Sequence, residues 1–225
     1  MKKDLTEIGV VIDRSGSMAL VASDAIGGFN TFLKSQQEQP GDANMTVLLF
    51  NEAITKYATN APVKGVAPLT SETYVAQGWT ALYDAVGTLI DEIGEKLAKT
   101  SEDSRPEKVI IAILTDGAEN KSRMYTQKMV FDKIALQRDT YNWEFIFLAA
   151  GEEAFKEGQA LGMSMSKMAK FANDSAGNSG AYETLCLYTS AIRSTKSFAE
   201  TEQLKSAVNL QSMVDENIAK ATVTP

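Results

Sequence analysis

Short apolar runs bounded by polar turns recur along the chain and predict β-strands. The runs are Leu5–Ile12, Met45–Phe50, Ile54–Thr59, Val109–Leu114 and Trp143–Ala150. Most are apolar throughout, which is typical of parallel strands that are covered on both faces. Ile54–Thr59 alternates apolar and polar residues instead, and we expect it to pair as a hairpin with the run before it, as a half-exposed edge strand. A last short edge strand is expected within Met163–Phe171.

Apolar residues at helical spacing lie between these runs and predict the helices. The first helix follows Ser17 and is marked by Leu20, Ile26, Phe29, Phe32 and Leu33. The second is expected to open at Thr80, with an apolar stripe of Leu82, Val86, Leu89, Ile90, Ile93 and Leu97. Two more are expected near Tyr125–Arg138 and before Leu161. The pair Gly27-Gly28 weakens the first helix, and it either lets the helix pack closely on the sheet or kinks it.

This alternation of strands and helices predicts an α/β fold: a doubly wound, mostly parallel central sheet flanked by helices, with one antiparallel edge strand. In such sheets, ligand sites lie beyond the carboxyl ends of the strands. Residues 60–78 hold Pro62, Gly65 and Pro68 and show no sustained period. We expect them to form a long loop that returns the chain to that edge of the sheet.

The last quarter of the chain follows a different pattern. A breaker rich in Ser, Gly and Asn spans Asn173–Gly180, and a helix marked by Tyr182, Leu185, Tyr188 and Ile192 is expected after it. From Glu200 onward we expect a final helix that ends before Thr222, with one face formed by Leu210, Met213, Val214 and Ile218. The sequence thus divides into a domain of residues 1–172 and a helical extension of residues 173–225. We expect the extension to pack on the domain, and binding a partner is the alternative.

Three oxygen-bearing side chains follow the first strand at alternate positions: Asp13, Ser15 and Ser17. Carboxylate and hydroxyl oxygens that converge on one point suit a small hard cation such as magnesium. One carboxylate carries too little charge to hold a divalent ion, so distant residues must contribute. Thr80 at a helix start and Asp116 after the strand Val109–Leu114 are the candidates, and both are expected on the same edge of the sheet as Asp13.

These residues carry a resemblance to a known family. The pattern Asp13-x-Ser15-x-Ser17, then Thr80 in a Gly-x-Thr-Ala-Leu-x-Asp-Ala run, then Asp116 after an apolar strand, resembles the metal-ion-dependent adhesion site (MIDAS) of von Willebrand factor A (VWA) domains. The resemblance covers roughly residues 5–171. It implies a bound magnesium or manganese ion, with calcium less suited, and a protein partner that donates an acidic side chain to the metal's open position.

The resemblance also implies how each residue meets the ion. Ser15 and Ser17 would bind directly, Thr80 directly or through water, and Asp13 and Asp116 directly or through ordered waters. The competing interpretation is an Asx turn with Ser17 as a helix cap. It leaves Thr80 and Asp116 unexplained.

Four further residues border the expected site. Trp79 is either an exposed interface anchor or packed inward. Arg14 is expected to point away from the ion, where it either tunes the charge offered to a partner or is simply exposed to solvent. Glu119 and Asn120 are expected on the rim, and Glu119 is a candidate for the open metal position when no partner is bound.

Composition removes several classes of function. The 225 residues include no histidine and one cysteine, Cys186, so Ser-His-Asp and Cys-His catalysis, Cys-cluster zinc sites and intrachain disulfides are excluded. Cys186 is expected to be a small buried residue on a helix. The formal charge of −7 disfavours binding to nucleic acids or anionic membranes. Acidic residues interrupt the apolar run after Met1-Lys2-Lys3, so we expect a soluble, unexported, cytoplasmic protein.

Three functions fit these observations. The first is a metal-dependent protein-binding adaptor or scaffold, which is not an enzyme. The second is a magnesium-dependent phosphotransferase or hydrolase with Asp13 as nucleophile, although no general base and no phosphate-binding loop accompany it. The third is a structural subunit whose metal only stiffens the rim. The family resemblance further implies a bacterial or phage origin and, because such domains often accompany ATPases, an ATPase as a candidate partner.

Overall fold

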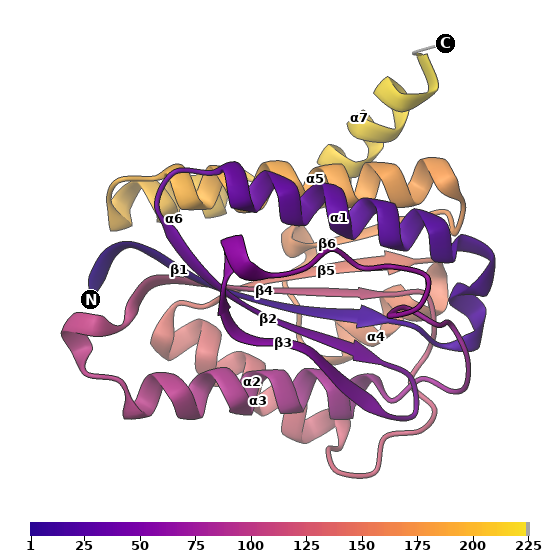
Figure 1. The fold of residues 1–225 in the computed structure, drawn as a ribbon, viewed down its shortest axis with the longest axis horizontal. Coiled ribbons are helices and arrows are strands. Elements are labelled where there is room, and N and C mark those ends of the chain that lie inside the picture. The colour runs from indigo at the N-terminus through magenta and orange to yellow at the C-terminus, as the bar shows by residue number, and fades with distance from the viewer. Residues whose placement is uncertain (224–225) are drawn as a thin grey trace.

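A six-stranded sheet forms the centre of the molecule. The computed structural model describes the backbone of residues 1–223 and the side chains of residues 1–221. The sheet has the order β3-β2-β1-β4-β5-β6 (Figure 1). Its strands are β1 (Lys2–Asp13), β2 (Asp42–Phe50), β3 (Ile54–Pro62), β4 (Pro106–Thr115), β5 (Glu144–Ala150) and β6 (Met168–Phe171). All neighbours pair in parallel except β2 and β3, so the predicted fold class is confirmed, including its antiparallel edge strand.

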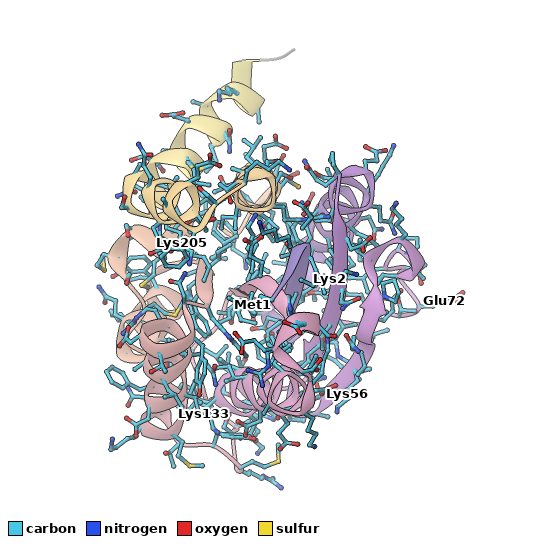
Figure 2. All side chains as sticks on the ribbon, turned by 90° about the vertical axis from the view of Figure 1, so that its left-hand side faces the viewer. Met1, Lys2, Lys56, Glu72, Lys133 and Lys205 are labelled. Atoms are coloured by element: carbon cyan, nitrogen blue, oxygen red, sulfur yellow. The ribbon has the colours of Figure 1, made fainter. Side chains whose placement is uncertain are left out.

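Helices cover both faces of the sheet. On the upper face in Figure 1 lie α1 (Ala22–Glu38), α5 (Ser175–Ser194), α6 (Phe198–Ala207) and α7 (Leu210–Val223). On the lower face lie α2 (Leu82–Lys99), α3 (Gln127–Tyr141) and α4 (Glu152–Ala160). Figure 2 shows the layers end-on, with Lys205 of α6 above the sheet and Lys133 of α3 below it. None of the helices within residues 1–223 is long and apolar enough to cross a membrane.

The residues of β1 explain why both faces are covered. Successive side chains of a strand point to opposite faces. Val10 and Ile12 join the upper core, while Val11 joins the lower one, and all are fully buried. Gly9, which precedes them, faces α2: a Cβ atom built there would lie 2.8 Å from Ile93 Cδ1. The missing side chain therefore allows α2 to pack closely against the middle of the sheet.

Two helix starts differ from the prediction. A 3₁₀ turn, η1 (Gly16–Val21), follows the first strand, and α1 begins only after it. The second helix begins at Leu82 with Ala81 at its N-cap, so Thr80 lies in the loop before the helix. Helix α1 begins five residues after Ser17 and α2 two residues after Thr80, because local pattern does not locate the first hydrogen-bonded turn. The shift keeps Thr80 at the carboxyl edge of the sheet.

The Gly27-Gly28 pair does not pack on the sheet. A Cβ atom on Gly28 would lie 2.1 Å from the ring of Tyr182 on α5, whereas none of the described atoms lies near a Cβ at Gly27. The close approach is therefore between α1 and α5, two helices on the same face. The local pattern predicted close packing on the sheet or a kink and not contact with a second helix, because it carries no information about which partner a helix meets.

The C-terminal segment is more helical than predicted. Asp174 accepts a hydrogen bond from the Gly177 amide (2.8 Å) and caps α5, so most of the predicted breaker is its first turns. The expected final helix is two helices, because Val208 is extended, and α7 continues to Val223. Its residues Leu210 and Val214 are fully buried in the upper core. Thr224 and Pro225 lie outside the described residues, and the domain boundary at residue 172 stays a prediction.

Cys186 lies on α5 and is buried and unpaired, as expected. Burial raises the pKa of its thiol to about 12. It therefore remains a neutral thiol near neutral pH and acts as a small core residue.

Candidate metal centre

Asp13 is the last residue of β1, and the fold holds its carboxylate in place. The side chain is 0 % exposed. Its Oδ1 accepts a hydrogen bond from the Ser15 amide (2.7 Å), and its Oδ2 accepts one from Thr115 Oγ1 (2.6 Å) at the end of β4. The Tyr74 hydroxyl donates to the Asp13 carbonyl (2.5 Å) from the long loop. Three segments thus meet where the strand order reverses around β1, which is where ligand sites form in doubly wound sheets.

The side chains of Ser15 and Ser17 connect the end of β1 with Asp116. Ser15 Oγ lies 3.1 Å from Ser17 Oγ, and Ser17 Oγ donates to Asp116 Oδ1 (2.7 Å). Asp116 directly follows β4, so this line joins the loops after two neighbouring parallel strands. The Ser15 amide bond to Asp13 is an Asx turn, but neither η1 nor α1 receives a side-chain cap from Ser17. The Ser17 hydroxyl instead faces the second carboxylate.

Thr80 reaches the same place from the loop before α2. Its amide donates to Asn120 Oδ1 (2.9 Å), and the Asn120 amide donates back to the Thr80 carbonyl (3.0 Å). A Cβ atom built on Gly117 would lie 3.2 Å from Thr80 Oγ1 and 3.9 Å from Ser17 Oγ. The buried Thr80 hydroxyl therefore lies beside the Asp116 loop, and the structure brings all five predicted metal ligands to one edge of the sheet.

Trp79, next to Thr80, is exposed rather than packed inward. Its side chain is 60 % exposed, and Lys121 Nζ lies 5.7 Å from the centre of the ring. The Trp79 amide donates to Glu52 Oε2 (2.7 Å). Gly78 before it has φ of +78°, a backbone conformation that favours glycine, and a Cβ there would displace the Glu52 carboxylate.

The other predicted rim residues have structural partners. Arg14 Nη2 donates to Thr55 Oγ1 at the start of β3 (2.7 Å), so its half-buried side chain extends toward the sheet edge. Glu119 accepts hydrogen bonds from the amides of Tyr83 (3.0 Å), Lys121 (2.7 Å) and Ser122 (2.6 Å). These bonds engage both carboxylate oxygens of Glu119. The Glu119 carboxylate therefore binds the start of α2 and its own loop and is not directed at an open metal position. Asn120 holds Thr80 in place.

Sequence reasoning missed two residues that hold the carboxylates. Thr115 donates to Asp13, and Asn173 Nδ2 donates to Asp116 Oδ2 (2.9 Å) from the turn before α5. Thr115 could have been found, because it ends a strand beside β1. Asn173 carried no signal, because it lies in a stretch read only as a breaker.

The electrostatics of the site favour a bound cation. Burial raises the pKa of Asp13 to about 6, hydrogen bonds from Thr115 and Ser15 only partly offset it, and the charge of Asp116 adds to it. Burial also raises the pKa of Asp116. Within the described residues, no group of three or more His, Cys, Asp or Glu side chains is arranged so that it could hold a metal ion. The donor set is therefore two carboxylates plus hydroxyls, which fits a hard divalent ion.

The strand order, the antiparallel edge and the helices on both faces are those of the Rossmann-like VWA fold. A von Willebrand factor type A protein from Catenulispora acidiphila superposes with a TM-score of 0.58, at 16 % identity, over 83 % of this chain and 42 % of that one. Proximal thread matrix protein 1 from the mussel byssus, with a zinc-occupied MIDAS motif, gives 0.55 at 16 % identity over 82 % and 46 %. Manganese-loaded TRAP protein of Plasmodium vivax gives 0.54 at 14 % identity over 76 % and 70 %.

No protein-family model matches the chain, and no curated protein matches its sequence. This chain spans less than half the length of the mussel and Catenulispora chains. At these identities the likeness shows the fold alone.

Proposed function

We propose that this chain is a divalent-cation-dependent protein-binding module, an adaptor or scaffold in which Asp13, Ser15, Ser17, Thr80 and Asp116 hold the ion. The observation that supports this most strongly is the chain of side-chain contacts from Ser15 to Ser17 and from Ser17 to Asp116, because Ser17 and Asp116 lie 99 positions apart in the sequence. A local turn or a helix cap requires no such meeting of distant oxygen donors.

Magnesium is the ion we propose, with manganese as the nearest substitute and calcium less suited. Hydroxyl and carboxylate oxygens are hard donors that such ions prefer. The zinc-occupied motif of the mussel protein and the manganese-loaded Plasmodium protein support a divalent cation on this fold. When bound, the ion supplies a coordination position that an Asp or Glu of a partner protein can take.

We propose binding rather than catalysis at this site. A nucleophilic carboxylate needs an oxygen that a substrate can approach. Asp13 is fully buried and both its oxygens accept hydrogen bonds, so neither oxygen is open to a substrate. The chain also lacks histidine, the commonest general base.

Two exposed apolar side chains flank the centre, and we propose that the partner contacts them. Trp79 precedes Thr80, and Leu20 of η1 is 94 % exposed. Residues three apart in a 3₁₀ helix lie on the same side, so Leu20 projects on the side of Ser17. Exposed aromatic residues are common anchors of protein interfaces. A partner would therefore present an acidic side chain with apolar neighbours.

The metal is tested by calorimetric titration of magnesium and of manganese. We expect Asp13→Ala and Asp116→Ala to abolish binding, while Asp103→Ala, which removes an exposed aspartate at the opposite edge of the sheet, leaves it unchanged. Circular dichroism checks that each variant is folded. Unchanged affinity in both site variants contradicts the proposal.

The partner chemistry is tested by selecting peptides from a displayed random library on the protein with manganese and eluting them with EDTA. We expect the eluted peptides to share an Asp or Glu and to lose binding to the Ser15→Ala/Ser17→Ala variant. Peptides that bind equally in manganese and in EDTA contradict metal-bridged recognition.

A further inference from the structure

The turn that opens α5 reaches into the metal centre. Asn173 Nδ2 donates to Asp116 Oδ2 (2.9 Å), while Ser17 Oγ donates to Asp116 Oδ1 (2.7 Å). The two oxygens of one carboxylate are thus held by two different segments, one by the serine loop and one by the turn before α5. Asn173 lies beyond the stretch on which the sequence resemblance rests.

Several bonds fix this turn. The Asp174 amide donates to the Ala172 carbonyl (2.8 Å), and Asn178 Nδ2 donates to the Asp174 carbonyl (2.9 Å). Gly177 packs against the same turn: a Cβ there would lie 2.0 Å from the Ala172 carbonyl oxygen. The Asn173 amide is therefore presented from a short turn that is closed on both sides, rather than from a free loop.

We propose that Asn173 is a positioning residue of the metal centre, which orients the Asp116 carboxylate so that Oδ1 faces the serine hydroxyls. This rests on the proposed function, because it assigns Asn173 to the residues that support the ligands of the same ion. Groups that hydrogen-bond to a metal ligand fix its orientation, and their loss typically weakens metal affinity about 10–100-fold. Asp116 is only partly buried, and the side chains that hydrogen-bond to its two oxygens are Ser17 at Oδ1 and Asn173 at Oδ2, with Ser15 close to the same carboxylate.

A bond at the surface could instead only hold the α5 turn in place. That alternative predicts that removing the bond lowers the stability of the fold and leaves the affinity for the ion unchanged. Ser175 provides the matched comparison, because its Oγ donates to Asp24 Oδ1 (2.9 Å) from the same turn without touching Asp116. Both bonds are exposed, so neither variant should prevent folding.

The experiment titrates manganese into the wild-type chain, Asn173→Ala and Ser175→Ala, and measures urea unfolding of each in EDTA. We expect Asn173→Ala to bind manganese at least about tenfold more weakly at nearly unchanged metal-free stability. Ser175→Ala is expected to stay within about twofold of wild-type affinity.

An Asn173→Ala variant with wild-type affinity overturns the inference, and so does an equal loss of affinity in Ser175→Ala, since the turn and not the amide would then matter. Asp116→Ala, titrated beside them, separates this from the proposed function. If Asp116→Ala loses manganese and Asn173→Ala does not, only the role of Asn173 is wrong. If Asp116→Ala also binds normally, the metal centre itself is wrong.

Discussion

Two fully buried carboxylates, those of Glu7 and Asp13, lie on the same strand, β1, but they have different hydrogen-bond partners. Lys96 Nζ of α2 donates to Glu7 Oε2 (2.6 Å) and also to the Asn60 side chain. Among the described residues, the Asp13 carboxylate accepts hydrogen bonds from Ser15 and Thr115, which carry no charge. Both residues are 0 % exposed, so the contrast lies in their partners and not in their burial.

The pKa shifts of Glu7 and Asp13 reflect this difference in partners. Burial raises the pKa of Glu7, and the hydrogen bond and charge of Lys96 counteract it. Burial raises the pKa of Asp13 as well, but there the nearby charge of Asp116 adds to the effect. A buried charge needs a compensating partner. The chain supplies one for Glu7 by itself, and we infer that it leaves Asp13 to a cation from solution.

The largest effect is expected from removing the positive charge of Lys96, the partner of Glu7. Lys96→Met leaves Glu7 buried without its partner and should lower the free energy of unfolding by about 3 kcal/mol, the lower end for a broken buried pair because Lys96 is 27 % exposed. Urea unfolding measures this, and magnesium affinity should not change. Adding Glu7→Leu should recover much of the loss. A change below about 1 kcal/mol would mean that Glu7 finds its compensation elsewhere.

Asp13→Asn should act in the opposite direction. Asparagine keeps the shape and the acceptor for the Ser15 amide but removes the uncompensated charge. A pKa of about 6 in place of 3.8 corresponds to at most about 3 kcal/mol, so the metal-free variant should be more stable than wild type at pH 7 by up to that amount. The variant should also fail to bind magnesium. A variant that is less stable than wild type in EDTA contradicts this account of Asp13.

The same shift sets a pH dependence for the metal-free wild-type protein. Between about pH 4 and pH 6 the folded state keeps a proton on Asp13 that the unfolded state has released, so this group makes stability fall as pH rises and has no further effect above about pH 6. Urea unfolding in EDTA across this range should show the fall in wild type, and the Asp13→Asn curve should lack it. Parallel curves would count against the raised pKa.

The smallest effect concerns the rim. Trp79→Ala should weaken binding of a selected acidic peptide by about 1–2 kcal/mol, because an exposed aromatic anchor is lost, and should leave magnesium affinity unchanged. Phe198→Ala is the control, since it removes another exposed aromatic side chain, on α6 at the other edge of the sheet. Equal peptide affinity in all three proteins would remove Trp79 from the interface.

The strands, and the position of the five proposed ligands at the carboxyl ends of the strands, could be predicted because both depend on local pattern. An apolar run such as Val109–Leu114 specifies a buried strand wherever it lies, and parallel strands place their carboxyl ends together. Asp13 and Asp116 were therefore expected together at the carboxyl ends of the strands. The local pattern also predicted that Ile54–Thr59 is an edge strand, because one of its faces is polar.

What could not be predicted depends on partners from distant segments. Nothing near Asn173 in the sequence indicates that its amide meets Asp116, 57 positions away. The packing of Gly28 against Tyr182 and the engagement of Glu119 with the start of α2 are of the same kind. These contacts follow from how helices and loops meet in three dimensions, and one-dimensional periodicity does not contain that information.

The central claim is that a cation compensates Asp13 and Asp116, and crystals grown with manganese test it most directly. Anomalous diffraction should show one strong peak about 2.1 Å from the Ser15 and Ser17 hydroxyl oxygens and beside Asp116, with none at Glu7. Manganese peaks elsewhere on the surface, with none among these oxygens at saturating metal, would contradict the account.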